Sequence, residues 1–246
     1  MQIPFFSSPE KIEFINEIDG VAELMPMIPA KQHRNSWVNK AAQDFAEKRE
    51  MPLWNHDKLM HTARCPGIFS LQRHGWIMRT WQDIEITTYG DGKGFVWKAA
   101  TNIGGDPVGQ HPPEQLSNFF DEWPQHTLKA IVKIHTGWRC LVPKGYYLME
   151  MPLPLSDEQR FTAIPGYFSR EAGPANMNVQ LMWHVMSGST LIKAGTPIAQ
   201  YVLVPKEQMD MECRGAKKED GLWLSHLYDA SKFVKNYADV KRLFGK

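Results

Sequence analysis

Between about Ile68 and Val204 the hydrophobic residues come in short runs that are rich in β-branched and aromatic side chains, each bounded by Gly, Pro, Asn or Asp. This pattern predicts an antiparallel sheet protein. It is clearest from Asn178 to Val185, where every second residue is apolar, so one face of that strand is expected to lie in the core. The predicted strands are Ile68 to Leu71, Gly75 to Arg79, Asp83 to Thr88, Gly94 to Lys98, Lys129 to Ile134, Arg139 to Val142, Tyr146 to Met151, Phe161 to Ile164, Asn178 to Val185, Thr190 to Ile192 and Ile198 to Val204. The glycine-rich stretch Tyr89 to Gly94 is expected to form a hairpin loop.

The N-terminal part of the chain has a different pattern. Lys11 to Ile18 begins with the alternation of a half-buried strand. From Ser36 the apolar residues recur at helical spacing, which predicts an amphipathic helix over Trp37 to Arg49. Ser36 is expected to cap this helix, and Pro52 is expected to end it.

After Pro205 the chain becomes charged, and apolar residues at spacings of three and four predict a C-terminal helix over roughly Asp229 to Phe244. The fold class expected is therefore mainly β: an antiparallel β-sandwich or barrel with an N-terminal helix and a C-terminal helix. Three parts follow from this pattern. They are an N-terminal strand, helix and loop extension over residues 1–63, a β-barrel domain over 64–207, and a charged linker with the C-terminal helix over 208–246.

The charge balance limits the partners. The 246 residues contain 28 Lys and Arg against 27 Asp and Glu, a formal net charge of +1, so there is no general basic field for nucleic acid or anionic lipid. Even the basic run Arg214 to Lys218 is followed by Glu219 and Asp220. We expect no extended nucleic-acid partner and no membrane partner, because the apolar stretches are also too short for a membrane helix.

The cysteines and the N-terminus bear on the compartment. Cys65, Cys140 and Cys213 are widely spaced and odd in number, which argues against a disulfide framework and against a thiolate zinc site. The first ten residues lack the basic and apolar regions of a secretory signal. A cytoplasmic location is expected.

Several catalytic motifs are missing. The chain contains no His-Glu-x-x-His, no Walker phosphate loop and no Gly-x-Ser-x-Gly. None of the nine histidines is followed two positions later by Asp or Glu, as the usual facial-triad form of non-haem iron enzymes requires. The sequence identifies no cofactor.

The densest group of polar and aromatic residues is Trp54-Asn55-His56-Asp57, followed by His61, Arg64 and Cys65. Two imidazoles, a carboxylate and a thiol could ligate a metal ion. The alternative is a structural loop in which Trp54 anchors against the sheet and the polar groups bind local backbone. Cys65, next to Arg64, is either a thiol of lowered pKa that acts as a nucleophile or an inert buried thiol.

Other histidines and aromatic residues are candidates of the same two kinds. His111 and His126 lie beside prolines in loops, where they either line the mouth of a site or connect strands. His135 precedes Trp138 and Arg139, so an imidazole, an indole and a guanidinium are expected near one sheet edge. Trp138 is either a ligand platform or a core anchor. His184 alternates with core residues and is expected to be structural.

Two motifs stand near the end of the β-rich region: Phe161-Thr-Ala-Ile-Pro-Gly-Tyr167 and Leu191-Ile-Lys-Ala-Gly-Thr-Pro-Ile-Ala-Gln200-Tyr-Val-Leu-Val. With the strand between them they resemble the distal motifs of the dUTPase and dCTP deaminase superfamily. The resemblance implies a dUTPase-like barrel, a trimer, and contacts of Arg139, Tyr167 and Gln200 with a base or phosphate. The chain departs from the superfamily at the chemistry. It has Ile164-Pro-Gly-Tyr167 without the water-activating Asp, Met151-Pro-Leu-Pro-Leu155 in place of the phosphate motif, and no glycine-rich C-terminal arm.

A longer set of landmarks comprises Arg64-Cys-Pro66, Trp138, Pro143-Lys-Gly-Tyr146 and Gly195-Thr-Pro-Ile-Ala-Gln200. These landmarks resemble an uncharacterised family of β-rich proteins found in bacteria and tailed phages. The resemblance implies one continuous domain over about Arg64 to Glu207 and no particular mechanism. If a phage encodes the protein, it also implies association with a virion in place of the cytoplasmic location.

Three functional hypotheses follow. The first is a non-enzymatic β-barrel protein that binds a ligand or partner, including a phage structural or accessory protein, and forms a homo-oligomer. The second is a metal-dependent, oxygenase-like enzyme with ligands among His56, His61, His111, His126 and His135. The third is a diverged nucleotide-binding enzyme of the dUTPase-like barrel. A small-molecule ligand is expected to contact residues from the groups above: Trp54, His56, Arg64, Cys65, Trp138, Arg139, Tyr167 and Gln200.

Overall fold

The computed structural model describes residues 11–33, 35–47, 66–115 and 120–215. The chain divides into two compact units, residues 1–207 and residues 208–246. The described part of the second unit, 208–215, contains no helix or strand. The predicted C-terminal helix over Asp229 to Phe244 lies outside the described residues, as do Trp54, His56, His61, Arg64 and Cys65.

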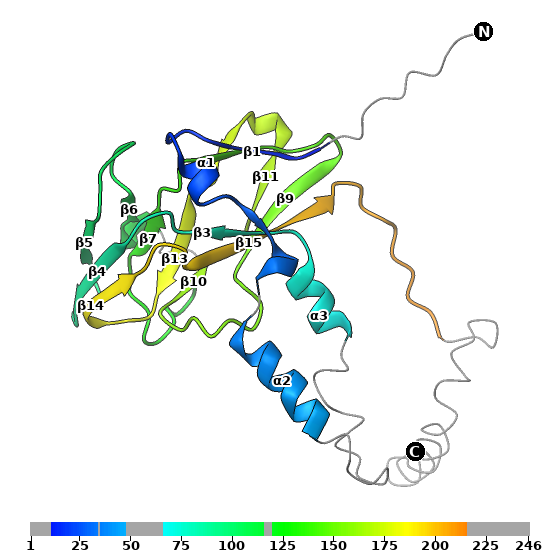
Figure 1. Cartoon of the computed structure of the whole chain (residues 1–246), viewed down its shortest axis with the longest axis horizontal. Helices are drawn as coiled ribbons and strands as arrows, with labels where there is room; N and C mark the ends of the chain where they lie inside the picture. The colour runs from blue at the N-terminus through cyan, green and yellow to red at the C-terminus, as the bar shows by residue number, and fades with distance from the viewer. Residues whose placement is uncertain (1–10, 34, 48–65, 116–119, 216–246) are drawn as a thin grey trace. The chain divides into compact units, whose positions relative to one another are not determined.

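The first unit is mainly β, as the sequence predicts, and all its strand pairs are antiparallel (Figure 1). The largest sheet has the order β11-β9-β15-β3-β2, with strands Gly166–Ser169, Tyr146–Met151, Pro197–Pro205, Trp76–Arg79 and Ile28–Pro29. A four-stranded sheet has the order β10-β13-β7-β6, with strands Phe161–Ala163, Val179–Trp183, Ile131–Ile134 and Val108–His111.

Two three-stranded sheets complete the described part of this unit. One has the order β1-β8-β12, with strands Glu13–Asn16, Trp138–Leu141 and Ala175–Asn176. The other has the order β14-β4-β5, with strands Ser187–Ile192, Ile84–Tyr89 and Phe95–Ala99. Over the described ranges the strands therefore form four separate sheets and do not close into a single barrel. The hairpin predicted at Tyr89 to Gly94 is confirmed, because β4 pairs directly with β5.

The predicted strand over Ile68 to Leu71 is wrong. These residues lie in helix α3, Pro66–Arg73. The run Ile-Phe-Ser-Leu is too short for its spacing to distinguish a buried strand from a helix. Proline favours the first helical position, because its missing N–H has no partner there, and Pro66 is the first residue of α3.

The other helices are short except for α2. They are α1 Val21–Leu24, η1 Ala30–Gln32, α2 Ser36–Glu47, η5 Pro113–Gln115 and η6 Arg170–Ala172. Helix α2 begins at Ser36, which was expected to be the cap just before it, and the Ser36 hydroxyl donates a hydrogen bond to Asp157. No helix of the described residues is long and apolar enough to cross a membrane.

The sequence pattern missed four strands, β2, β6, β11 and β12. Strand β6 reads Val-Gly-Gln-His and β11 reads Gly-Tyr-Phe-Ser, and neither has apolar alternation. The strands β2 and β12 have two residues each, which is too short for any period to be visible. Their positions are set by pairing with neighbouring strands.

The core lies between the sheets and consists of buried aliphatic and aromatic residues. Trp183 is fully buried, and its ring stacks on Phe161 with centroids 6.1 Å apart. Glu150 is an exception to the apolar composition, because it is only 4% exposed and its carboxyl accepts a 2.6 Å hydrogen bond from the Tyr201 hydroxyl. Burial raises the pKa of Glu150 from 4.5 to about 7, although the hydrogen bond from Tyr201 opposes that change.

Strand β3 begins at a close approach to β15. Gly75, the residue before β3, has φ +78°, and a Cβ atom there would overlap the carbonyl oxygen of Tyr201. Glycine has no Cβ and readily takes this backbone conformation. Gln200 fixes the end of α3 at the same place, since its amide nitrogen donates 2.8 Å hydrogen bonds to the carbonyl oxygens of Leu71 and His74.

Candidate functional site

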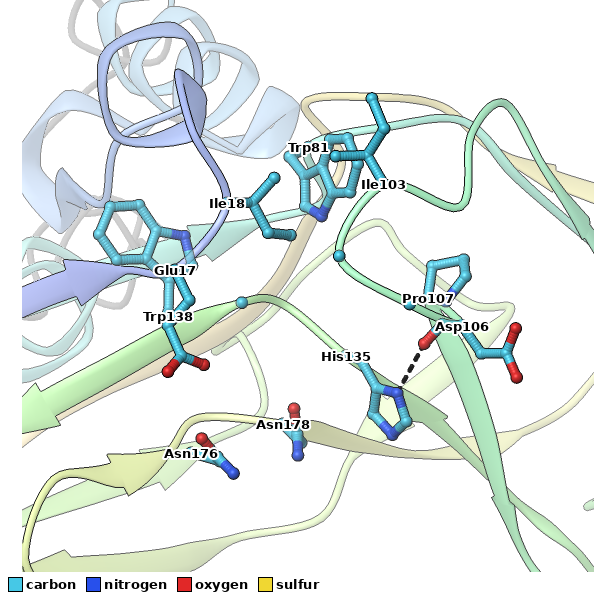
Figure 2. Close-up of a pocket in the computed structure, with 13 residues that line it drawn as sticks. Glu17, Ile18, Trp81, Ile103, Asp106, Pro107, His135, Trp138, Asn176 and Asn178 are labelled. Atoms are coloured by element: carbon cyan, nitrogen blue, oxygen red, sulfur yellow. Dashed lines mark hydrogen bonds between the residues drawn. The ribbon is translucent and has the colours of Figure 1, made fainter.

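A cavity of about 330 Å³ lies where the ends of several strands meet (Figure 2). Five separate segments line it: residues 17–18 after β1, Trp81 after β3, the loop 103–107 between β5 and β6, residues 135, 137 and 138 around the start of β8, and Asn176 in β12 with Asn178 just before β13. Its volume is at the lower end of the range of about 300–1,000 Å³ that is usual for small-molecule sites. This cavity is the candidate functional site.

Ile18 forms part of the apolar wall of the cavity and lies against two glycines. A Cβ atom at Gly137 would be 2.8 Å from Ile18 Cδ1, and one at Gly104 would be 3.0 Å from Ile18 Cγ1. Both glycines have positive φ values, +71° and +81°. Asn16 holds this segment in place, because its Oδ1 accepts the Ile18 N–H at 2.9 Å and its Nδ2 donates to the Thr136 carbonyl at 3.3 Å.

His135 is held in one tautomer by the loop before β6. Its Nδ1 lies 2.7 Å from the backbone carbonyl oxygen of Asp106, as the dashed line in Figure 2 marks. A carbonyl only accepts, so Nδ1 carries the proton, and in the neutral ring Nε2 is an acceptor. Gly109 makes room for the ring, since a Cβ atom there would be 3.1 Å from Nε2.

Glu17 lines the cavity, and its carboxylate is paired with the guanidinium of Arg139. Arg139 Nε donates to Glu17 Oε1 at 2.6 Å, and the same guanidinium donates from NH1 to the Pro174 carbonyl at 3.2 Å. The guanidinium balances the charge of the carboxylate, whose second oxygen can still accept a hydrogen bond. The pair is well exposed, with side-chain exposures of 36% and 52%, so its effect on stability is small.

Two carboxamides complete the polar wall. The side chains of Asn176 and Asn178 make no hydrogen bond with any other residue of the described ranges, and the same holds for the Trp81 indole N–H. In Figure 2 the polar groups of Glu17, His135, Asn176 and Asn178 lie on one side of the cavity, and Ile18, Trp81 and Ile103 lie on the other. None of the described residues that line it is Lys or Arg.

Two of the residues predicted for the site lie at the cavity. Trp138 lines it, and Arg139 contacts the lining residue Glu17. Trp138 is only 4% exposed and belongs to the core. Its indole therefore packs in the core and also forms part of the cavity wall. Arg139 acts through its contact with Glu17. Trp54, His56, Arg64 and Cys65 lie outside the described residues.

Tyr167 and Gln200 lie away from this cavity. Tyr167 is 63% exposed on β11, and its ring centroid is 5.3 Å from that of Tyr147. Gln200 is 1% exposed, and its two side-chain hydrogen bonds hold the end of α3. The described structure therefore does not gather Arg139, Tyr167 and Gln200 into one site.

The histidines proposed as metal ligands are likewise dispersed over the described structure. His111 Nδ1 lies 2.8 Å from Gln115 Oε1, and His135 Nδ1 is bound to a carbonyl. Within residues 11–33, 35–47, 66–115 and 120–215 no three His, Cys, Asp or Glu side chains come together as a metal site. His184 lies between two threonines, with Nδ1 3.1 Å from Thr127 Oγ1 and Nε2 2.9 Å from Thr162 Oγ1, and burial lowers its pKa.

The sequence reasoning missed the polar lining residues Glu17, Asp106, Asn176 and Asn178, and it also missed the apolar wall with Ile18, Trp81 and Ile103. One pattern could have indicated two of them. Asn176 and Asn178 flank the buried Met177 just before a strong β pattern, so alternation places both amides on the face opposite the core. Nothing in the local sequence indicates that residue 17 lies beside residue 139.

The fold and site together describe a mainly antiparallel β protein with a polar pocket at the ends of its strands. No protein-family model matches the chain, and no curated protein matches it. Among solved structures, the native EIAV dUTPase is similar at 10% identity and a TM-score of 0.31, covering 58% of this chain and 85% of that one. Two structures of the dUTPase from phage phi11 of S. aureus, one of them a mutant, are similar at 11% identity and TM-scores of 0.32 and 0.31, each covering 58% of this chain and 83% of that one. These scores are too low to carry any conclusion about function.

Proposed function

We propose that the protein is a non-enzymatic β-rich binding protein and that the cavity beside Glu17, His135 and Asn178 takes a small polar molecule without a phosphate group. The observation that carries this proposal is the convergence of hydrogen-bonding groups with unused capacity on one concave surface. Two carboxamides, a carboxylate with one oxygen that Arg139 does not use, and the His135 ring line a half-apolar cavity. Such a combination of apolar wall and few convergent polar groups is typical of ligand sites.

The charge of the lining disfavours a phosphorylated ligand. Phosphate sites depend on Arg, Lys or clustered backbone N–H groups at a helix start. The described lining residues include two carboxylates and neither Arg nor Lys. The nearest guanidinium, Arg139, already donates to Glu17 and to the Pro174 carbonyl.

The lining also favours binding over catalysis. No Ser, Thr, Cys, Tyr or Lys is among the described lining residues, so the groups in contact with the cavity that can act as nucleophiles are the carboxylates of Glu17 and Asp106 and the His135 ring, and no hydroxyl, thiol or amine side chain is among them. The one buried thiol of the described core is Cys140, and burial raises its pKa to about 11. A thiol of that pKa is a poor nucleophile near neutral pH.

Thermal stabilisation by small polar metabolites tests the proposal. A ligand at ~100 times its Kd that binds only the native state adds ~2.7 kcal/mol, which for a unit of this size raises Tm by about 5 to 10 °C. The variant Asn176→Trp fills the cavity from an exposed position and should abolish the stabilisation, whereas Asn102→Trp, on a nearby exposed loop and outside the lining, should retain it. Equal stabilisation of Asn176→Trp and wild type would overturn the proposal.

A second candidate function, partner binding or self-association through a strand edge, rests on Tyr167. In the described sheet β11 is an edge strand that pairs only with β9, and it carries this 63%-exposed tyrosine. Open strand edges with exposed aromatic residues favour pairing with another chain. Light scattering should give an oligomer, a trimer being one expectation, and Tyr167→Lys should reduce the mass towards the monomer; a monomeric wild type contradicts self-association.

A further inference from the structure

We infer that the ligand of this cavity is an uncharged saccharide, bound through the hydroxyl groups of one ring. The inference rests on the proposed function, since it names the chemical class of the same site's ligand. It is based on the balance of donors and acceptors, on the charge, and on the two-sided character of the cavity.

The polar wall offers donors and acceptors in mixed order. Each of Asn176 and Asn178 presents an N–H₂ donor and a carbonyl acceptor, and neither is used within the described structure. Glu17 offers its second carboxylate oxygen as a further acceptor. His135 Nε2 lies against Gly109 and is not counted among these groups. A hydroxyl group donates one hydrogen bond and accepts others, so vicinal hydroxyls match such a wall, whereas an ammonium group, primary or quaternary, accepts no hydrogen bond and leaves the amide N–H groups unpaired.

The local charge does not call for a cationic ligand. Arg139 balances Glu17 at 2.6 Å. The Asp106 carboxylate is exposed, and in Figure 2 it points away from Glu17 and the two asparagines. The polar wall is therefore close to neutral, although it contains a carboxylate.

The opposite wall is apolar and includes an indole. Trp81 is half-buried, and Ile18 and Ile103 lie on the same side of the cavity in Figure 2. A sugar ring has C–H groups on its faces and hydroxyls around its edge, so it can place a face on this wall while its edge meets the amides. Burial of C–H groups against an aromatic surface gives the apolar part of the affinity.

The first experiment is a glycan array with neutral and charged saccharides, followed by calorimetry of the best binder and, in parallel, of choline as an organic cation. We expect a neutral saccharide to bind with a Kd that does not change between low and high salt, because no charge is neutralised. Asn178→Ala should weaken binding by about threefold to tenfold, the usual effect of one hydrogen bond. The matched control Asn102→Ala, outside the lining, should bind like wild type.

Glu17→Gln separates the two ligand classes, because it keeps an acceptor and removes the charge. For a saccharide the affinity should fall by less than about fivefold, and for a cation by more than about tenfold. Binding of choline but not of saccharides, with dependence on Asn178 and on salt, would overturn the saccharide inference and leave the proposed function standing. Saccharide binding that Asn178→Ala and Asn176→Trp leave unchanged would overturn the inference as well, since the sugar would then bind elsewhere. Failure of every array saccharide, of choline and of the metabolite screen would overturn both.

Discussion

Glu150→Gln should change how the stability of the protein depends on pH. The Glu150 carboxyl is buried in the core, where the Tyr201 hydroxyl donates a hydrogen bond to its Oε2 at 2.6 Å. Glutamine has nearly the same shape and keeps an oxygen that can accept this hydrogen bond, but it does not titrate. The substitution therefore removes the charge without creating a cavity.

The magnitude follows from the pKa of Glu150, which burial raises from 4.5 to about 7 in the folded protein. Each unit of pKa difference corresponds to ~1.4 kcal/mol, so the full effect is about 3 kcal/mol. Because the folded-state pKa is above the unfolded one, the folded protein holds this proton more tightly. Its contribution to stability is complete below pH 4.5, falls as the pH rises through 7, and is absent above that.

The measurement is the free energy of unfolding in urea at a series of pH values from 4 to 8, for wild type and Glu150→Gln. The difference between the two proteins should grow by about 3 kcal/mol in favour of the variant across this range. Tyr201→Phe serves as a second variant: its hydroxyl lowers the pKa of Glu150, so without it the fall in stability should move to higher pH. If the difference in the free energy of unfolding between wild type and Glu150→Gln stays constant over the whole pH range, the pKa of Glu150 is not raised by burial and this reasoning is wrong.

Other predictions concern packing and backbone geometry. Trp138→Ala should destabilise the protein by roughly 3 to 5 kcal/mol in urea unfolding, because the indole is 4% exposed and in the core; a near-neutral effect would instead mark an exposed platform. Gly75→Ala should lower the free energy of unfolding by more than about 2 kcal/mol, because the strain of a positive φ adds to overlap with the Tyr201 carbonyl. Gly67→Ala in α3, where a Cβ meets nothing within 4 Å, should raise the free energy of unfolding by about 0.5 to 1 kcal/mol. Similar effects at both glycines would contradict this geometry. Gln200→Ala should cost about 1 to 3 kcal/mol and speed amide hydrogen exchange in α3, and unchanged exchange there would show that its two hydrogen bonds do not hold the helix.

The strands with regular alternation could be predicted from the sequence. Val179, Leu181 and Trp183 are fully buried on one face of β13, as a period of two requires. The error at Ile68 to Leu71 has the opposite cause, because three apolar residues within four positions fit either period, and the signal that distinguishes the two is Pro66 at the helix start.

The site could be predicted only in part, because loops from distant positions build it. Trp138 and Arg139 were found as an indole and a guanidinium at a strand end, and the structure places both at the cavity. Glu17 and Asn178 come from segments whose local sequence indicates nothing about one another. Gln200 was singled out by its motif, yet its side chain is buried against α3, since a motif at a strand also reflects what the strand packs on.

The pairing of β1 with β8 also determines when, during synthesis, the cavity can exist. Glu17 and Arg139 are 122 positions apart, and Asn16 and Thr136 are 120 apart. Residues 17 and 18 leave the ribosome long before β8, the strand with which β1 pairs. Strand β1 therefore stays unpaired until β8 has been synthesised, and contacts of such long range make folding slow. Residues 176–178 follow later still. A chain interrupted anywhere before them has no complete cavity, and ligand binding in a folding reaction would therefore mark the moment at which residues 17–18 and residues 176–178 have come together.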